Sequence, residues 1–161
     1  MVLAVLLLAA PACDRAGESG PDPTPSSPAF TLPSLFGRGT ATIEVPDDIV
    51  TLEVEIARTD EAHQRGLQGR TSLPSDSGMV FLFPDEQPRR FWMKDTLIPL
   101  SIAYFRADGT IVSIRDMDPC TAEPCPLYDS GAPAQGALEV NQGFFEAHGV
   151  RLNDVITITE A

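Results

Sequence analysis

The sequence predicts an α+β domain built mainly from antiparallel β strands, arranged as a small barrel or sandwich with two short helices. Two observations carry this prediction. The apolar segments after Thr40 are short, and the clearest of them alternates apolar and polar residues with a period of two. The length of 161 residues is enough for one such domain with a modest tail.

The first clear strand candidate spans residues 49–58, where apolar side chains occupy alternate positions. This pattern is typical of a strand with one buried face. Thr59 follows directly and is predicted to cap a short helix over residues 60–65. Acidic residues in its first turn and Gly66 near its end support both boundaries.

The remaining elements are predicted from short apolar runs and from turn residues. Asp108 and Gly109 form a pair that is typical of a hairpin turn between two strands. A helical turn is predicted over residues 144–148, closed by Gly149. The further strands are predicted at residues 79–83, 91–93, 100–105, 110–114, 137–140 and 155–159.

Residues 1–12 read MVLAVLLLAAPA, an apolar run shorter than the roughly 20 residues that a membrane-spanning helix needs. The run resembles the core of a secretory signal peptide. Cys13 follows small residues, as in a bacterial lipobox, where the cysteine is lipidated and becomes the new N-terminus. We therefore expect an exported lipoprotein held on the cell membrane or in the periplasm. The alternatives are an ordinary signal peptide with an incidental cysteine, giving a secreted soluble protein, and a buried hydrophobic terminus.

Residues 13–39 contain five prolines, several Gly and Ser residues and few large apolar residues. A segment of this composition buries too little apolar surface to fold, and its prolines make it stiff and extended. We expect a tether that holds a folded domain of residues 40–161 away from a surface. A leader without a mechanical role is the alternative.

The net charge of the chain argues against nucleic acid as a partner. The chain has 23 acidic and 11 basic residues and a net charge of −12. Nucleic-acid binding is disfavoured because the phosphate backbone attracts clustered Lys and Arg. Ten of the basic residues are Arg, and Lys94 is the one lysine in the sequence.

The two cysteines after Cys13 are Cys120 and Cys125, which lie in a proline-rich segment. In an oxidising compartment such a pair is expected to form a structural disulfide. A redox-active or metal-binding pair is the alternative. It is disfavoured because four residues separate the cysteines, rather than two, and no histidine lies nearby.

Several sequence blocks occur in one order along the chain: RGLQGR at residues 65–70, LP at 73–74, GMVFLFP at 78–84, FWMKDT at 91–96, PL at 99–100 and ALEV at 137–140. Together they resemble the DUF192 family of bacteria and archaea, over roughly residues 50–158. This resemblance implies a compact β-rich domain that is often exported and has no established activity. Two positions differ from the family pattern, since Asp95 stands where Asn is common and Ser101 where Asp is common.

The FWMKDT block contains the candidate ligand-binding residues. On a strand, Trp92, Lys94 and Thr96 would share one face, and such a face could stack a sugar or aromatic ring and hold a carboxylate or phosphate. Asp95 and Glu139 are further candidates for the same site. The alternative is that Trp92 fills the core while Lys94 pairs with a nearby acid, which the high average burial of Trp favours.

Two other kinds of chemistry have weaker support. Asp95, Asp116 and Glu139 could meet as an acid/base pair for glycoside hydrolysis, but their spacing does not show that they do. Thioether groups suit Cu(I), yet without a histidine cluster the methionines are expected to fill the core. We therefore predict no metal and no cofactor. The methionines concerned are Met79, Met93 and Met117.

The sequence thus predicts a ligand-binding or accessory domain without catalytic activity, tethered to the membrane through a lipid on Cys13. Its expected partners are the membrane and either a small-molecule ligand or an envelope protein. One alternative is an enzyme that acts on cell-envelope polymers through Asp95 and Glu139. The other is a structural partner in an envelope complex.

Overall fold

A computed structural model describes residues 34–161, which form seven strands and two helices. The predicted signal peptide at residues 1–12, Cys13 and most of the predicted tether lie outside the described residues. The elements are β1 (Gly37–Val45), β2 (Asp48–Ala57), α1 (Asp60–Arg65), β3 (Ser77–Trp92), β4 (Leu100–Phe105), β5 (Ile111–Met117), β6 (Leu127–Asn141), α2 (Phe144–Ala147) and β7 (Val155–Glu160).

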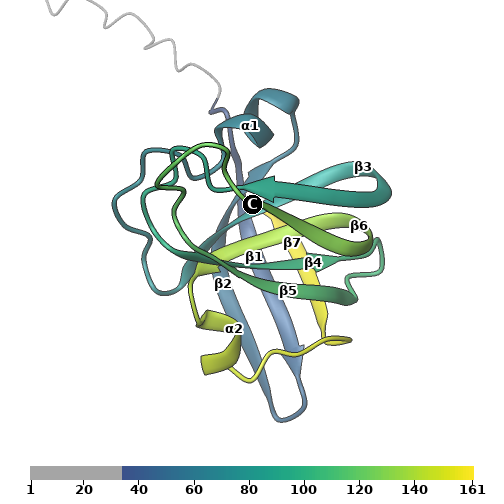
Figure 1. The fold of residues 1–161 in the computed structure, drawn as a ribbon. Coiled ribbons are helices and arrows are strands. Elements are labelled where there is room, and N and C mark those ends of the chain that lie inside the picture. The colour runs from purple at the N-terminus through teal and green to yellow at the C-terminus, as the bar shows by residue number, and fades with distance from the viewer. Residues whose placement is uncertain (1–33) are drawn as a thin grey trace, which may run out of the picture. The chain divides into compact units, whose positions relative to one another are not determined.

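The strands form one sheet in the order β5-β4-β6-β3-β2-β1-β7, with α1 and α2 near opposite ends of its strands (Figure 1). Every neighbouring pair in this sheet is antiparallel except β2 and β3, which are parallel. Helix α1 lies in the connection between those two strands, because a parallel pair requires a crossover. The predicted α+β class with mostly antiparallel strands is therefore confirmed.

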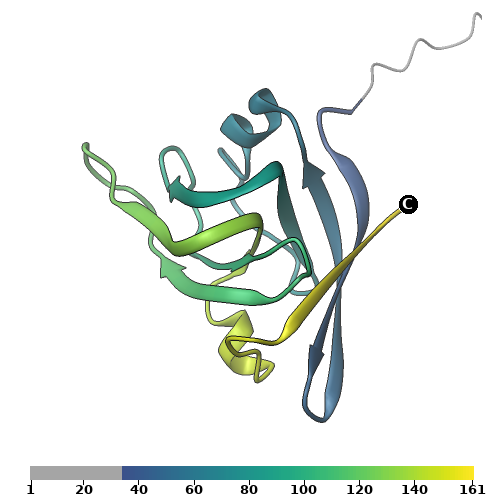
Figure 2. The same cartoon turned by 90° about the vertical axis from the view of Figure 1, so that its right-hand side faces the viewer.

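The sheet curls so that its two edge strands meet at one point (Figure 2). Thr110 and Val155 form an isolated antiparallel bridge. Beside it, the Ile111 backbone N–H donates to the Asp154 carbonyl at 2.9 Å, and the Ile156 N–H donates to the Gly109 carbonyl at 2.9 Å. A single bridge does not close the sheet, so the barrel or sandwich part of the prediction is not confirmed.

The helix predicted over residues 60–65 is confirmed as α1, and so are the residues predicted to cap it. The Thr59 side chain accepts a hydrogen bond from the Ala62 N–H at 3.2 Å, which satisfies a backbone donor in the first turn. At the other end the Gly66 N–H donates to the Ala62 carbonyl. Gly66 has a φ of 42°, a conformation that side chains disfavour, so glycine allows the chain to leave the helix here.

Three strands differ most from the prediction. Strand β6 begins at Leu127, ten residues before the strand predicted at residues 137–140. Strand β1 begins at Gly37, within the expected tether and three residues before the expected start of the domain at Thr40. Its glycine-rich start has no apolar alternation, and pairing with β2 and β7 makes it a strand. The strands predicted at residues 79–83 and 91–93 are one element, β3, which continues through two prolines. Its register against β6 shifts near both, because proline interrupts a ladder and is tolerated at a bulge.

Strand β4, the first part of β3 and the last part of β6 are buried on both faces. Successive residues on each strand point to opposite faces, so Leu138 belongs to one hydrophobic cluster and Ala137 to the other. The first cluster lies against β1, β2, β7 and α2. The second includes Ala62 and Leu67 from α1 and the loop after it, and it is the cluster that borders the candidate site.

Gly136 tests this packing, because a methyl group at its Cα would overlap the Phe105 ring of the neighbouring strand. We expect Gly136→Ala to lower the free energy of unfolding by about 1–3 kcal/mol, as overpacking does. Thermal denaturation measures the effect. Gly37→Ala is the matched control, since its methyl group would lie at an ordinary 3.5 Å from the Ile56 Cβ. Equal melting temperatures for the two variants would contradict the packing described.

Candidate functional site

A small cavity of about 30 Å³ opens between residues 63–68 of α1 and its following loop, the end of β3, and the C-terminal part of β6. Of the five predicted ligand-site residues, four line this cavity. The structure therefore brings together residues of the FWMKDT block and a residue of β6 that lies some 45 positions later in the sequence. The four are Trp92, Lys94, Thr96 and Glu139.

Glu139 lies near the C-terminal end of β6, opposite Met79 of β3 and Ile102 of β4. Strand alternation turns its side chain toward the second hydrophobic cluster, where the residue is 4% exposed. In the described residues no hydrogen bond involves the carboxyl group of Glu139. No side-chain oxygen or nitrogen of these residues is both fully shielded from solvent and without a hydrogen-bond partner. The carboxyl oxygens of Glu139 therefore face the open space of the cavity that it lines.

Burial raises the pKa of Glu139 to about 8. An ionised carboxylate is costly to place among apolar groups, and no hydrogen bond or positive charge offsets that cost here. The side chain is thus a neutral carboxylic acid at pH 7. In that form it carries one O–H donor as well as acceptor oxygens.

Trp92 is the last residue of β3, and 52% of its surface is exposed. The expectation that Trp92 fills the core is therefore wrong, because the register places it beside the exposed Leu127 at the end of the ladder between β3 and β6. The expectation that Lys94 pairs with an acid is confirmed. Its Nζ lies 3.0 Å from Glu123 Oε1 and 5.9 Å from the centroid of the Trp92 ring.

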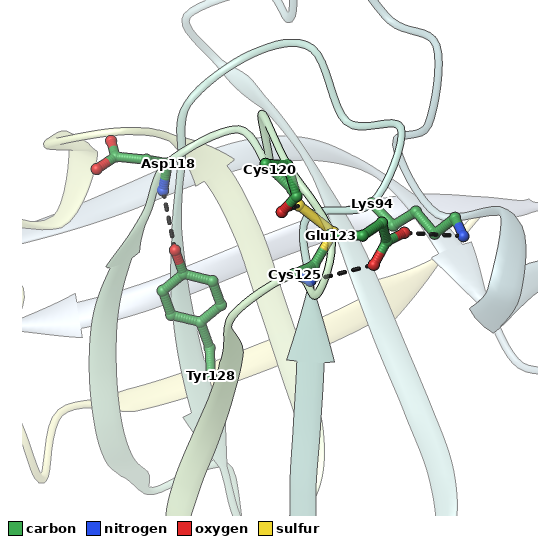
Figure 3. Close-up of a disulfide and its surroundings, with 7 residues drawn as sticks. Lys94, Asp118, Cys120, Glu123, Cys125 and Tyr128 are labelled. Atoms are coloured by element: carbon green, nitrogen blue, oxygen red, sulfur yellow. Dashed lines mark hydrogen bonds and ion pairs between the residues drawn. A yellow bond between two sulfur atoms is a disulfide. The ribbon is translucent and has the colours of Figure 1, made fainter.

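The disulfide between Cys120 and Cys125 shapes the loop that carries Glu123 (Figure 3). One oxygen of the Glu123 carboxylate accepts a hydrogen bond from the Cys125 N–H at 3.2 Å, while the other contacts Lys94. The hydrogen bond and charge of Glu123 raise the pKa of Lys94 above its ordinary value. Lys94 is thereby held as an ammonium group at the rim of the cavity.

The chain turns sharply between Lys94 and Thr96. Asp95 has a φ of 56°, a left-handed conformation that Asp and Asn tolerate better than most residues. Its carbonyl accepts a hydrogen bond from the Gly69 N–H at 2.8 Å, which ties this turn to the loop after α1. Asp95 itself does not line the cavity, whereas Thr96, after the turn, is buried in its wall.

The structure does not gather the three acids considered for hydrolysis around this cavity. Of these, only Glu139 is among its lining residues. Asp116 instead accepts a hydrogen bond from the Ser101 hydroxyl at 2.5 Å. The same hydroxyl oxygen accepts from the Gly143 N–H at 2.9 Å, so Ser101 connects β4 to the start of α2. Ser101 and Asp116 therefore have a structural role in the fold.

Two cavity residues had no predicted role. His63 Nε2 lies 3.1 Å from the Ala57 carbonyl and 3.2 Å from the Leu82 carbonyl. Because both neighbours are acceptors, this nitrogen carries a proton and holds α1 against β2 and β3. Arg65 lines the cavity at the end of α1. Neither position could be recognised from the sequence, because its place depends on how α1 packs on the sheet.

Two further structural facts bear on function. Residues 34–161 contain no group of three or more His, Cys, Asp or Glu side chains that could hold a metal ion. In the same residues, neither helix has the length and apolar character needed to cross a membrane.

Comparison with known proteins gives a family and a fold. Residues 41–158 match the sequence model of the DUF192 family, whose description is an uncharacterised ACR. A candidate transcription regulator from Sinorhizobium meliloti is similar in structure, with a TM-score of 0.73 and 28% identity over 79% of this chain and 98% of that one. A protein of unknown function from Novosphingobium aromaticivorans has a TM-score of 0.71 and 26% identity over 83% and 94%. No curated protein matches the chain.

The raised pKa of Glu139 predicts a particular dependence of stability on pH. The folded state keeps a proton that the unfolded state releases above its ordinary pKa of 4.5. The contribution of Glu139 to stability is therefore most favourable below about pH 4.5 and falls as the pH rises to about 8, by at most about 5 kcal/mol. Glu139→Gln stays neutral, so we expect it to be more stable than the wild type at pH 8 and similar at pH 4.5.

Denaturant unfolding at a series of pH values measures this difference. Glu146→Gln, which removes an exposed carboxylate from α2, is the matched control and should follow the wild type. The same pH profile for Glu139→Gln and the wild type would show that the Glu139 carboxyl is not buried as described.

Proposed function

Because this chain belongs to the uncharacterised DUF192 family, we propose a function from its cavity: a ligand-binding accessory domain tethered to the cell envelope. The observation that carries the proposal is the meeting of Trp92, Lys94, Thr96 and Glu139 around one opening. Ligand sites commonly combine an exposed aromatic surface with a few convergent polar groups. Here the half-exposed Trp92 ring supplies the surface, and the other three side chains supply the polar groups.

The ligand expected at this site has a ring that stacks on Trp92 and a polar substituent that enters the cavity. Sugars and aromatic compounds both provide a ring face of the required kind. The cavity is too small to enclose a ring, so the ring would lie outside it against the indole. Recognition would then depend on the substituent, which meets Glu139 and Thr96.

Binding is favoured over catalysis by the carboxyl groups of the cavity. Glycoside hydrolysis ordinarily uses two carboxyl groups that flank the scissile bond, and Glu139 is the only one among the lining residues. The alternative of an enzyme on envelope polymers retains one supporting observation. A carboxyl group with a pKa of about 8 could act as a general acid at neutral pH. Asp95, its expected partner, lies outside the cavity lining.

A role as a structural partner in an envelope complex has a different support. Trp92 and Leu127 lie opposite each other on β3 and β6, and both are exposed. An exposed apolar pair of this kind could contact another protein. Nucleic acid is disfavoured as a partner, because residues 34–161 carry twenty acidic and ten basic side chains. For this reason we do not extend the description of the Sinorhizobium meliloti protein to this chain.

Trp92 is the one tryptophan in the sequence, so its fluorescence reports on the cavity rim. We expect at least one member of a panel of cell-wall sugars, sugar acids and small aromatic acids to shift its emission and raise the melting temperature. Calorimetry should show that Trp92→Ala weakens this binding about tenfold, given the worth of ring stacking. Leu127→Ala, at the opposite position on β6, should bind normally. No response to any member of the panel would reject the proposed function.

The proposed envelope location is tested separately at Cys13. If this cysteine carries the lipid anchor, Cys13→Ser should move the protein from the membrane fraction to the soluble fraction of the producing cells. Immunoblotting of the two fractions measures the change. A variant that remains in the membrane fraction in wild-type amount would refute the anchor and leave the ligand site unaffected.

A further inference from the structure

We infer that the group entering the Glu139 cavity is a carboxylate, carried on a ring compound such as a sugar acid or an aromatic acid. This inference rests on the proposed function, because it names the substituent of the ligand expected there. It is carried by three features of the cavity: its volume, the charges that line it, and the unpartnered buried side chain of Glu139.

The volume limits the size of the substituent. To hold one water molecule, a cavity needs roughly 10–15 Å³ of space that the centre of a water-sized sphere can occupy. The cavity of about 30 Å³ therefore accepts about two oxygen-sized atoms. A carboxylate can place its two oxygens in this space with its carbon at the opening, whereas a phosphate or sulfate group has at least three terminal oxygens and is too large to enter. The size alone also permits a hydroxyl group, which the charges distinguish from a carboxylate.

The charges along the lining favour an anion. Lys94 and Arg65 are the lining residues that carry a formal positive charge, and Glu139 is the one acidic residue among them. Lys94 is tied to Glu123, while the ion pairs of residues 34–161 do not include Arg65. Both cations would repel a ligand ammonium group. A carboxylate would be attracted to both, and a neutral hydroxyl would make no use of them.

Glu139 completes the arrangement at the inner end of the cavity. As a neutral acid it presents an O–H donor to the incoming group, and Thr96, whose side chain carries a hydroxyl, lines the same cavity. A ligand carboxylate can accept hydrogen bonds from both and share the proton of Glu139. Once Glu139 loses that proton, two carboxylates would face each other at close range, and binding would weaken.

Groups from every neighbouring element face Glu139 or its cavity. His63 and Arg65 belong to α1, Lys94 to the turn after β3, and Tyr104 to β4. The pKa of Lys94 is raised by Glu123 and that of Tyr104 by burial, so both keep their protons through pH 9. Arg65 is always charged. Replacing Glu139 therefore isolates the effect of its own titration.

The test titrates the whole domain with two matched pairs of probes, glucuronate with glucose and benzoate with benzyl alcohol. Trp92 emission and calorimetry report the affinities. At pH 7 we expect the carboxylate of at least one pair to bind about tenfold more tightly than its neutral counterpart. Between pH 7 and pH 9 this affinity should fall about tenfold, because about a tenth of Glu139 remains protonated at pH 9. Glucose 6-phosphate should bind no better than glucose.

Two variants separate the contributions. Glu139→Gln keeps a donor and cannot ionise, so the carboxylate probe should bind within about threefold of wild type at pH 7 and no longer weaken by pH 9. Lys94→Gln should weaken the carboxylate probe about tenfold and leave its neutral counterpart unchanged. Arg151→Gln, which removes an exposed cation lining a different recess, is the matched control. Melting temperatures establish that each variant is folded.

Three outcomes would overturn the inference. A neutral probe that binds as tightly as its carboxylate would show that the cavity takes an uncharged group. A wild-type affinity that does not change between pH 7 and pH 9 would show that Glu139 does not donate to the ligand. Both results would leave the proposed function standing, because a ring ligand would still bind at Trp92. Binding of none of these probes would overturn the inference, and the wider panel decides whether the proposed function fails with it.

Discussion

The constraint on which this domain depends is the burial of its central strands on both faces. All six residues of β4 are buried, and β3 and β6 contribute alternate side chains to two separate clusters. One cluster is enclosed by the curl of the sheet together with α2. The other needs a cover, which α1, the loop after it and the turn after β3 provide. The candidate site lies at the place where this cover meets the sheet, because a buried strand there carries Glu139.

The charged groups around the site are positioned from three directions. The disulfide loop presents Glu123 to Lys94, the end of α1 presents Arg65, and β6 presents Glu139 from inside the cluster. A buried acid without a partner costs free energy of folding, so its retention in a well-packed cluster is best explained by a role outside folding. The geometry places that acid at the inner end of an opening whose rim is cationic and aromatic.

Local signals in the sequence predicted most of the fold. The alternating residues of β2, the Thr59 cap, and the turn at Asp108 and Gly109 specify their structures within a few residues, and all three are confirmed. The start of β1 has no such local signal. It is a strand because it pairs with β2 and β7, which are distant in the sequence or follow it. The continuity of β3 through its prolines was missed because a bulge depends on the neighbouring strand.

By itself, the sequence determined the fold class, the family blocks, the disulfide pair and the small set of residues from which a site could be built. Only the tertiary structure decided how those residues are used. It exposed Trp92, paired Lys94 with Glu123, excluded Asp95 from the cavity and placed Glu139 inside it. The physical reason is that burial and pairing depend on contacts between segments distant in sequence. An acid with an ordinary pKa in an extended chain becomes a neutral donor only when other strands and a helix exclude water from it.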